Sequence, residues 1–392
     1  MTNLQKKSPF STRFETLQSF RGFAILWIVL HHYLTAHEVY GPLVFGFFQI
    51  GYVGVTVFFV VGGFAIGMSA HRMREQGEGA FQFLKKRAAR IYVPYLFSLV
   101  FAALLIPAAL TFLSSLKSSL STDALKEYAV YYLPHYSAAE WLGFITLTKI
   151  FTADSWQLNR LFLPLNGVLW FIAVLMQMYL VIAAALGSRR FYGHVLTAVT
   201  LFSFIALIPA VKQGIPYGFF LPFWPQFAAG LALCEAVRRG WIPRSGPLFQ
   251  AGLTSLYLIF AGVLLYLCYT HTLFGLVLGG LFWMLLPFDK LLSGFRLMRF
   301  FAWLGSFSYS IYLIHVPLEP LLLALIRNAL PQVPFYAADL ILEIPLAILI
   351  SRVWYLFFEK PGTAEASVRA LCEPLRTLTG KLKTSRLWVV GR

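Results

Sequence analysis

Apolar segments of membrane-spanning length follow one another through most of the 392-residue chain, and they restrict what it can fold into. A helix needs about 20 mostly apolar residues to cross the hydrocarbon core of a bilayer. With glycine, proline and charge clusters as boundaries, we expect an all-α, polytopic membrane protein with about ten transmembrane helices. The predicted spans lie near residues 17–38, 44–70, 91–113, 166–187, 194–211, 218–237, 248–270, 272–288, 300–326 and 337–358.

The composition excludes a water-soluble protein with the usual share of polar residues on its surface. Hydrophobic residues make up 59% of the chain and charged residues only 12%, which leaves too little polar surface to cover a water-soluble fold. The net charge of +16 could suggest nucleic acid, but the basic residues form short clusters between apolar runs, as in cytoplasmic loops. We therefore expect no nucleic-acid partner.

The distribution of lysine and arginine predicts the orientation. If the N-terminus is cytoplasmic, 25 of the 32 basic residues fall in inner segments, six fall in outer segments, and Arg352 lies within the last span. This asymmetry favours both termini on the cytoplasmic side. The first segment lacks a cleavage site preceded by small residues, so we expect no cleaved signal peptide.

The stretch RGFAILWIVLHH places ionisable groups at both ends of the first span. Arg21 and His32 are 11 residues apart, which is three helical turns plus roughly 20° and about 16 Å of rise. They therefore share one helix face, whereas His31 is about 80° away from Arg21. Either these groups serve a function inside the bundle, or Arg21 snorkels to headgroups and His32 bonds a neighbouring helix.

A basic cluster opens the third span in the stretch KKRAARIYVPY. Lys86, Arg87 and Arg90 have the helical spacing of surface neighbours. Guanidinium forks recognise phosphate bidentately, so the cluster suits a phosphorylated ligand. By spacing alone, a topology signal or a contact with anionic lipid explains it as well.

The remaining features concern packing and boundaries. Gly63 and Gly67 have the small-x-x-x-small spacing that allows close helix approach, and the YTHT region predicts a tight hairpin of the seventh and eighth spans. The connection at 114–165 contains PHYSAAEWLGF, which we expect along the interface or partly over an outer cavity. The three cysteines have no metal-ligand spacing, so we expect no metal site.

Several blocks, in order and through nearly the whole chain, resemble the acyltransferase 3 family of integral membrane proteins. They begin with Arg21, ten intervening residues and His32. The other blocks are GYVGVTVFFVVGGFAIG (51–67), FLKKRAARIYVPY (83–95), LWFIAVLMQMYL (169–180), LGSFSYSIYLIHVP (304–317) and FEKP (358–361).

The resemblance implies transfer of an acyl group, commonly acetyl, onto an envelope or exported carbohydrate. It implies cytoplasmic acyl coenzyme A as donor, with Arg87 and Arg90, and Lys86 beside them, binding its phosphates. His32 would act as general base or acyl carrier, with Arg21 on the inner path. Residues 1–360 would be the transmembrane domain in a bacterial inner membrane, and 361–392 a short basic cytoplasmic tail.

This chain departs from the family pattern at positions where many relatives carry an acid. Those positions are occupied by Thr56 and by Leu175 and Met176, and Gly62 stands where many carry serine. If a carboxylate is needed, Glu343 and Glu319 are candidates, since Glu319 lies one turn beyond His315 on one helix face. We expect His32, His315, Glu319 and Glu343 at similar depth; the alternative is that His315 and Glu319 form only a local structural pair.

Two other functions remain open at this point. The chain could be a transporter or exporter of a glycan or lipid-linked precursor, with the buried charges lining a path. It could also be a structural membrane partner of a glycan synthesis complex. Besides acyl coenzyme A and carbohydrate, membrane lipids are expected partners, and nothing in the sequence specifies an oligomeric state.

Overall fold

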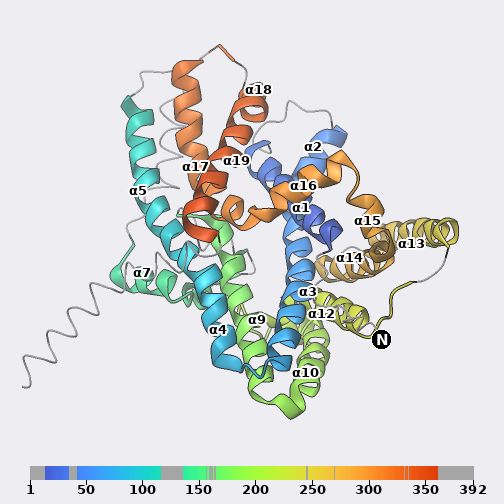
Figure 1. The fold of residues 1–392 in the computed structure, drawn as a ribbon. Coiled ribbons are helices and arrows are strands. Elements are labelled where there is room, and N and C mark those ends of the chain that lie inside the picture. Colours follow the sequence, from blue (N-terminus) through green and yellow to red (C-terminus); the bar gives the residue numbers. More distant parts are fainter. Residues whose placement is uncertain are drawn as a thin grey trace, which may run out of the picture.

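The computed structural model describes residues 14–360 except 35–41, 116–135, 156, 159–161, 163–164, 244–245, 269, 331 and 334. These residues form a helical bundle without strands, which confirms the all-α prediction (Figure 1). The predicted tail at 361–392 lies outside the described residues. The longer helices are α1 (Glu15–Leu34), α3 (Gly54–Glu75), α5 (Val93–Ser115), α9 (Trp170–Gly187), α10 (Tyr192–Ile205), α12 (Trp224–Arg238), α13 (Pro247–Cys268), α14 (His271–Leu285), α16 (Arg296–Ser306), α17 (Ser308–Ala329) and α19 (Ile344–Trp354).

Short helical pieces extend or connect these helices. They include single turns of 3-10 or π geometry at the helix ends, which tighten or widen the turn next to a bend. These pieces are α2 (Pro42–Gln49), η2 (Ile50–Val53), α4 (Ala80–Arg87), η3 (Ala88–Tyr92), α7 (Ala138–Ile145), η4 (Lys149–Thr152), η5 (Gly167–Leu169), η6 (Arg189–Phe191), α11 (Pro209–Lys212), η7 (Leu221–Phe223), η8 (Leu286–Phe288), α15 (Asp289–Leu292), α18 (Phe335–Ala338), η9 (Asp339–Glu343) and η10 (Tyr355–Glu359).

Each of the ten predicted spans coincides with helical structure, but not all the helices meet the length and hydropathy expected of a span. Within the described residues, five stretches are long and apolar enough to cross a bilayer, and the bent pair α16–α17 makes a sixth if it is one span. The complete ten-span topology and its orientation stay predictions. The five stretches are Phe45–Glu75, Ala80–Ala109, Gly167–Gly187, His271–Leu292 and Asp339–Glu359.

Two predicted boundaries were wrong. The third helical stretch begins at Ala80 rather than near residue 91, because the basic cluster is itself helical in α4 and η3. The ninth is not one helix over 300–326: α16 and α17 meet at 72°. Phe307 between them leaves the helical region, with φ −130° and ψ 23°, so the chain turns there.

A broad apolar face remains exposed on α13. An exposed patch of this size would be a liability in water and suits contact with lipid chains. The exposed positions on α13 are Phe249, Leu253, Leu256, Leu258, Ile259, Phe260 and Val263.

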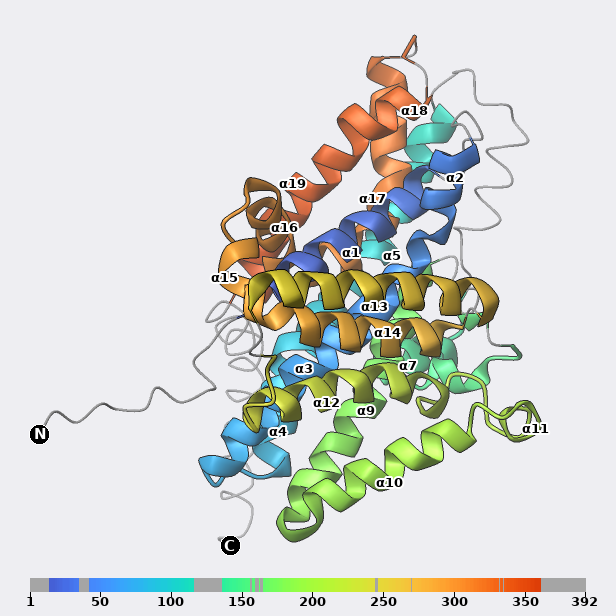
Figure 2. The same cartoon turned by 90° about the vertical axis from the view of Figure 1, so that its right-hand side faces the viewer.

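The predicted hairpin of the seventh and eighth spans is confirmed. Figure 2 shows α13 and α14 side by side. Thr270 begins α14 as its cap, because its Oγ1 accepts a hydrogen bond from the Leu273 amide at 3.1 Å. The Tyr257 hydroxyl of α13 donates to the Val277 carbonyl of α14 at 2.7 Å.

The connection around PHYSAAEWLGF contains α7 and is attached to the bundle. Ser137 and Glu140 form a capping box at the start of α7. The Tyr95 hydroxyl of α5 donates to the Phe144 carbonyl at 2.7 Å, and Asn166 Nδ2 donates to the Leu313 carbonyl of α17 at 2.8 Å. These bonds join the connection to α5 and α17; residues 116–135 of it lie outside the described residues.

Two helix crossings are so close that only glycine fits. At the α3–α12 crossing, a Cβ on Gly63 would overlap the Phe227 carbonyl, and a Cβ on Gly230 would overlap the Val60 carbonyl. At the α1–α16 crossing, Gly22 faces the Phe301 carbonyl in the same way. The close approach expected from the glycine spacing of the second span is therefore present.

We predict that Gly63→Leu destabilises the protein by at least about 3 kcal/mol, because α12 must move to admit the side chain. Gly62→Ala is the matched control: a Cβ at Gly62 meets nothing within 4 Å, so its melting temperature should stay unchanged or rise slightly. Thermal unfolding of the purified protein in detergent measures both. Equal melting temperatures for the two variants would contradict the assigned crossing.

Candidate active site

The N-terminus of α17 lies buried in the bundle, because the bend at Phe307 starts a new helix there. Ser308 and Ser310 have no exposed surface. Glu359 of η10 accepts hydrogen bonds from the Ser310 amide at 3.1 Å and from its hydroxyl at 2.6 Å. Arg21 of α1 donates from a guanidinium nitrogen to Ser308 Oγ at 3.1 Å. A carboxylate is stabilised at this position by the unpaired amides and the helix dipole.

Two further arginines adjoin this helix terminus. Arg21, Arg90 and Glu359 lie within electrostatic range of one another, and Arg87 lies within range of Arg90. Arg87 donates to Ser69 Oγ at 2.7 Å. The Nε–H of Arg87 is buried and has no acceptor among the described residues. This donor can therefore bond an acceptor on a ligand.

Lys86, the third basic residue predicted for phosphate binding, points to a different partner. Its ammonium donates to both carboxylate oxygens of Glu78, at 2.8 and 2.6 Å, in an exposed ion pair. The arrangement joins α4 to the end of α3 and engages Lys86 away from the arginines.

His32 and His315 face each other across the contact of α1 and α17. Their ring centroids are 5.2 Å apart. His315 is fully buried, and its Nδ1 lies 2.9 Å from the Ile311 carbonyl and 3.0 Å from the Tyr312 carbonyl. Since carbonyls only accept, Nδ1 carries the proton and Nε2 keeps a lone pair. Nε2 has no hydrogen-bond partner among the described residues.

His31 turns to the other side, as the helical spacing predicts. Its Nδ1 lies 3.0 Å from the Phe48 carbonyl of α2, and its ring packs at 5.7 Å against Tyr52. His32 rather than His31 is therefore the partner of α17. The His32 residue is largely buried in this contact.

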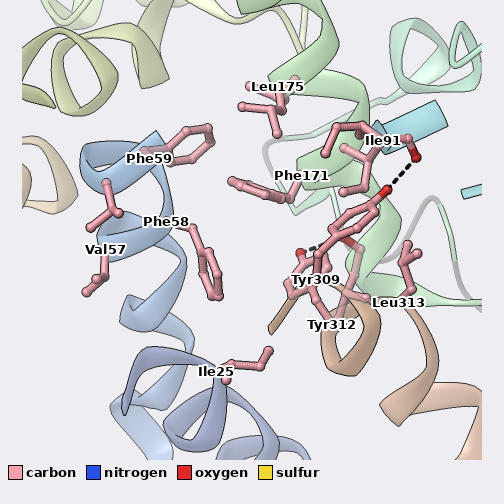
Figure 3. Packing of buried hydrophobic residues seen from close by; sticks show 14 of the residues in the cluster. Ile25, Val57, Phe58, Phe59, Ile91, Phe171, Leu175, Tyr309, Tyr312 and Leu313 are labelled. Atoms are coloured by element: carbon pink, nitrogen blue, oxygen red, sulfur yellow. Dashed lines mark hydrogen bonds between the residues drawn. The ribbon is translucent and has the colours of Figure 1, made fainter. Parts of the chain in front are cut away.

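An aromatic cluster lies between the arginines and the histidine pair. The Arg21 guanidinium is 5.9 Å from the Phe58 ring, and the Tyr312 ring is 6.1 Å from that of His315. The Phe171 ring contacts both Phe58 and Tyr312, with its centroid 6.2 Å from that of Phe58 and 5.4 Å from that of Tyr312. Figure 3 shows Phe171 of α9 extending toward α3, with the rings of Phe58 and Tyr312 below it. These rings therefore fill space between Arg21 and the histidine pair.

The acidic groups gather on the side of α17 and α19. Glu343 and Asp339 are each 2% exposed in η9, which packs against α1 and α17, and Glu319 is near Asp339. Thr56 and Leu175, at positions where the family resemblance led us to look for an acid, are buried in α3 and α9. Convergence of Glu343 with the histidines stays a prediction. No described group of three or more His, Cys, Asp or Glu is arranged to hold a metal ion.

The sequence interpretation gave no role to Glu359, Ser308 or Ser310. The signal was present in the FEKP block and in the two serines of SFSYSIYLIH. The sequence did not indicate the bend at Phe307. Without this bend, the two serines lie inside one long predicted span, and there is no helix terminus that the Glu359 carboxylate could cap.

Comparison with known proteins identifies the family of the chain. The profile of the acyltransferase 3 family, described as an acyltransferase domain, matches residues 14–354. An O-acetyl transferase of Shigella phage Sf6 is 25% identical over 209 residues, which is 53% of this chain and 56% of the phage protein. The match thus spans little more than half of that relative. No solved structure is significantly similar.

We predict that Glu359→Ala lowers the free energy of unfolding by about 2 kcal/mol, because two hydrogen bonds to a charged acceptor are lost at a buried helix terminus. Ser310→Ala should cost about 1 kcal/mol, since its amide still reaches the carboxylate. The double variant should lose less than the sum. Exposed Glu75→Ala is the control, and additive losses in thermal unfolding would contradict the shared bond.

Proposed function

Because the chain belongs to the acyltransferase 3 family, we propose that it is a membrane-embedded O-acyltransferase. It moves an acyl group from cytoplasmic acyl coenzyme A to a hydroxyl of an envelope or exported carbohydrate. The observation that carries this proposal is the His32–His315 pair, in which backbone carbonyls fix the proton of His315 on Nδ1 and leave its Nε2 lone pair beside the His32 imidazole. The phage relative is an O-acetyl transferase, which favours acetyl as the group transferred.

The donor binds at the arginines. Coenzyme A carries a pyrophosphate and a 3′-phosphate, which match guanidinium donors. Arg87 supplies a buried Nε without an acceptor among the described residues, and Arg90 supplies an exposed guanidinium next to it. Lys86 is held by Glu78, whose carboxylate offsets its charge, so Lys86 contributes no direct bond to the donor in this arrangement.

Arg21 lies between the donor phosphates and the reaction centre. It is anchored by Ser308 at the α17 terminus and is within range of Glu359. Along α1 it is about 16 Å from His32. The acyl arm therefore extends past Phe58 and Tyr312 while the nucleotide stays at the arginines.

His32 removes the proton of the acceptor hydroxyl as the oxygen attacks the thioester carbonyl. The carbon–sulfur bond breaks, and the coenzyme A thiolate leaves and takes up a proton. In the alternative scheme, a His32 nitrogen attacks the thioester, the carbon–sulfur bond breaks and the thiolate leaves with a proton. The acceptor hydroxyl oxygen then attacks the acylated imidazole, the acyl–nitrogen bond breaks, and the hydroxyl proton passes to the released His32 nitrogen. Imidazole suits both schemes because its unperturbed pKa lies near neutral pH.

His315 acts as a positioning residue for His32. With its proton held on Nδ1, the Nε2 of His315 has a lone pair without a partner among the described residues. A rotation of the neighbouring His32 ring would let a protonated His32 nitrogen donate to it, and this would orient the other nitrogen of His32 toward the acceptor. Glu343 in the buried turn η9 is the candidate carboxylate that stabilises a protonated histidine pair.

We further propose ten spans, both termini inside and a bacterial inner-membrane location, which the basic-residue asymmetry favours.

We predict that His32→Ala abolishes acylation of the envelope glycan and leaves a folded membrane protein. Mass spectrometry of the glycan from a deletion strain should show a lost acyl mass that wild type restores and His32→Ala does not. His194→Ala, at an exposed histidine of α10, is the matched control and should restore it. Full restoration by His32→Ala would refute the role of this histidine.

We predict that Arg87→Gln combined with Arg90→Gln raises KM for acyl coenzyme A by about tenfold to a hundredfold, because charge-assisted bonds to phosphate are lost. The KM is measured from the rate of acetyl transfer at increasing concentrations of radiolabelled acetyl coenzyme A in membrane vesicles. Lys85→Gln, at an exposed lysine, is the control and should leave KM unchanged. A transporter of a glycan precursor would instead move substrate without the donor and tolerate both substitutions.

A further inference from the structure

A second basic site lies between α3, α10 and α12, where these helices form a cavity of about 480 Å³. Volumes of this size are typical of sites for small ligands. One end of the cavity carries the charged side chains and the rest is lined by small and apolar ones. The side chains at the charged end are His71, Arg74, Glu235, Arg238 and Arg239, with Tyr192 beside them.

The charged end carries an excess of positive charge. Its three arginines against one glutamate give a formal charge of +2 when His71 is neutral. Glu235 binds Arg238 in a fork, at 2.8 and 2.6 Å, and also receives a hydrogen bond from Arg239 at 2.6 Å. Arg74 stacks at 4.4 Å on the neutral ring of Tyr192. Glu235 therefore holds Arg238 and Arg239 in place, and positive charge stays in excess among the side chains that line the cavity.

The apolar part of the cavity reaches the outer surface of the bundle. Leu196 and Leu201 of α10 and Leu231 of α12 line it, and Leu201 leaves 62% of its surface exposed. Its neighbours Phe202 and Phe204 are exposed as well. The cavity thus opens beside a helix face that suits lipid chains, with the arginines at its other end.

This cavity is separate from the arginines proposed to bind the acyl donor, because α3 stands between them. Gly67, His71 and Arg74 recur at helical spacing and share one face of α3. Ser69, which holds Arg87, lies about 200° around the helix from Gly67. One face of α3 is therefore turned toward Arg87, and the opposite face is turned toward the cavity.

We propose that the cavity binds an anionic phospholipid, with the headgroup phosphate on Arg74 and Arg238 and an acyl chain along Leu196 and Leu201. Guanidinium forks match phosphate oxygens, and basic pockets between transmembrane helices on the cytoplasmic side recognise anionic headgroups. A bound lipid would join α10 to α3 and α12. The separate donor arginines and the opening to the apolar surface favour a lipid over a soluble phosphate compound.

The test uses the full chain purified in detergent and phosphatidylcholine, with dioleoyl phosphatidylglycerol as probe. Wild type should show a melting temperature that rises as phosphatidylglycerol is added. Arg74→Gln combined with Arg238→Gln should bind it at least about tenfold more weakly. Arg72→Gln, at an exposed arginine of the same helix that does not line the cavity, should bind it as wild type does.

A second variant keeps the charges and fills the apolar part. Thr197→Trp, at an exposed position lining the cavity on α10, should also lose the stabilisation by phosphatidylglycerol while its melting temperature without lipid stays near that of wild type. Native mass spectrometry should count one retained lipid on wild type and none on Thr197→Trp.

Three results would overturn the proposal. Undiminished phosphatidylglycerol binding by the arginine double variant would show that the lipid binds elsewhere. Stabilisation by inorganic phosphate equal to that by the lipid would assign the arginines to a free phosphate compound. A tenfold rise in KM for acyl coenzyme A in the double variant, without loss of lipid binding, would assign the cavity to the acyl donor.

Discussion

The buried N-terminus of α17 is the constraint from which the candidate site follows. A helix terminus inside a bundle exposes amide groups that need acceptors, and here Glu359 of η10 supplies one to Ser310. Arg21 of α1 bonds Ser308 at the same place. Three segments that are far apart in the chain thus meet at one polar point in an apolar interior, where an unsatisfied group is costly. The arginines of the third helical stretch then adjoin an already charged location.

Close helix crossings set the distances around this point. Gly22 lets α1 lie against the backbone of α16, and Gly63 with Gly230 does the same for α3 and α12. The first crossing brings Arg21 to the turn after α16. The second crossing places α3 between two basic groups. Ser69 on one face of α3 bonds Arg87, and His71 on the opposite face lines the cavity between α3, α10 and α12. Backbone contact without side chains between the helices makes these positions insensitive to side-chain rearrangement.

Much of the site could be predicted from local spacing. The interval from Arg21 to His32 placed both on one face and excluded His31, which indeed turns to α2. Helical spacing also grouped Arg87 with Arg90. Spacing could not show that Lys86 pairs with Glu78, since that partner lies before the turn into α4. Nor could it show which helix His32 meets, because neighbours in a bundle depend on packing throughout the chain.

The sequence by itself determined that the chain is helical, apolar enough for a bilayer and built from segments of about the right length and order, because period and hydropathy are properties of each segment alone. It also identified the blocks shared with the acyltransferase 3 family. Only the tertiary structure decided that the ninth segment bends by 72°, that Glu359 caps the helix that begins there, and that His315 presents Nε2 beside His32. These features arise where separate helices meet, and the free energy of such a contact depends on both partners together.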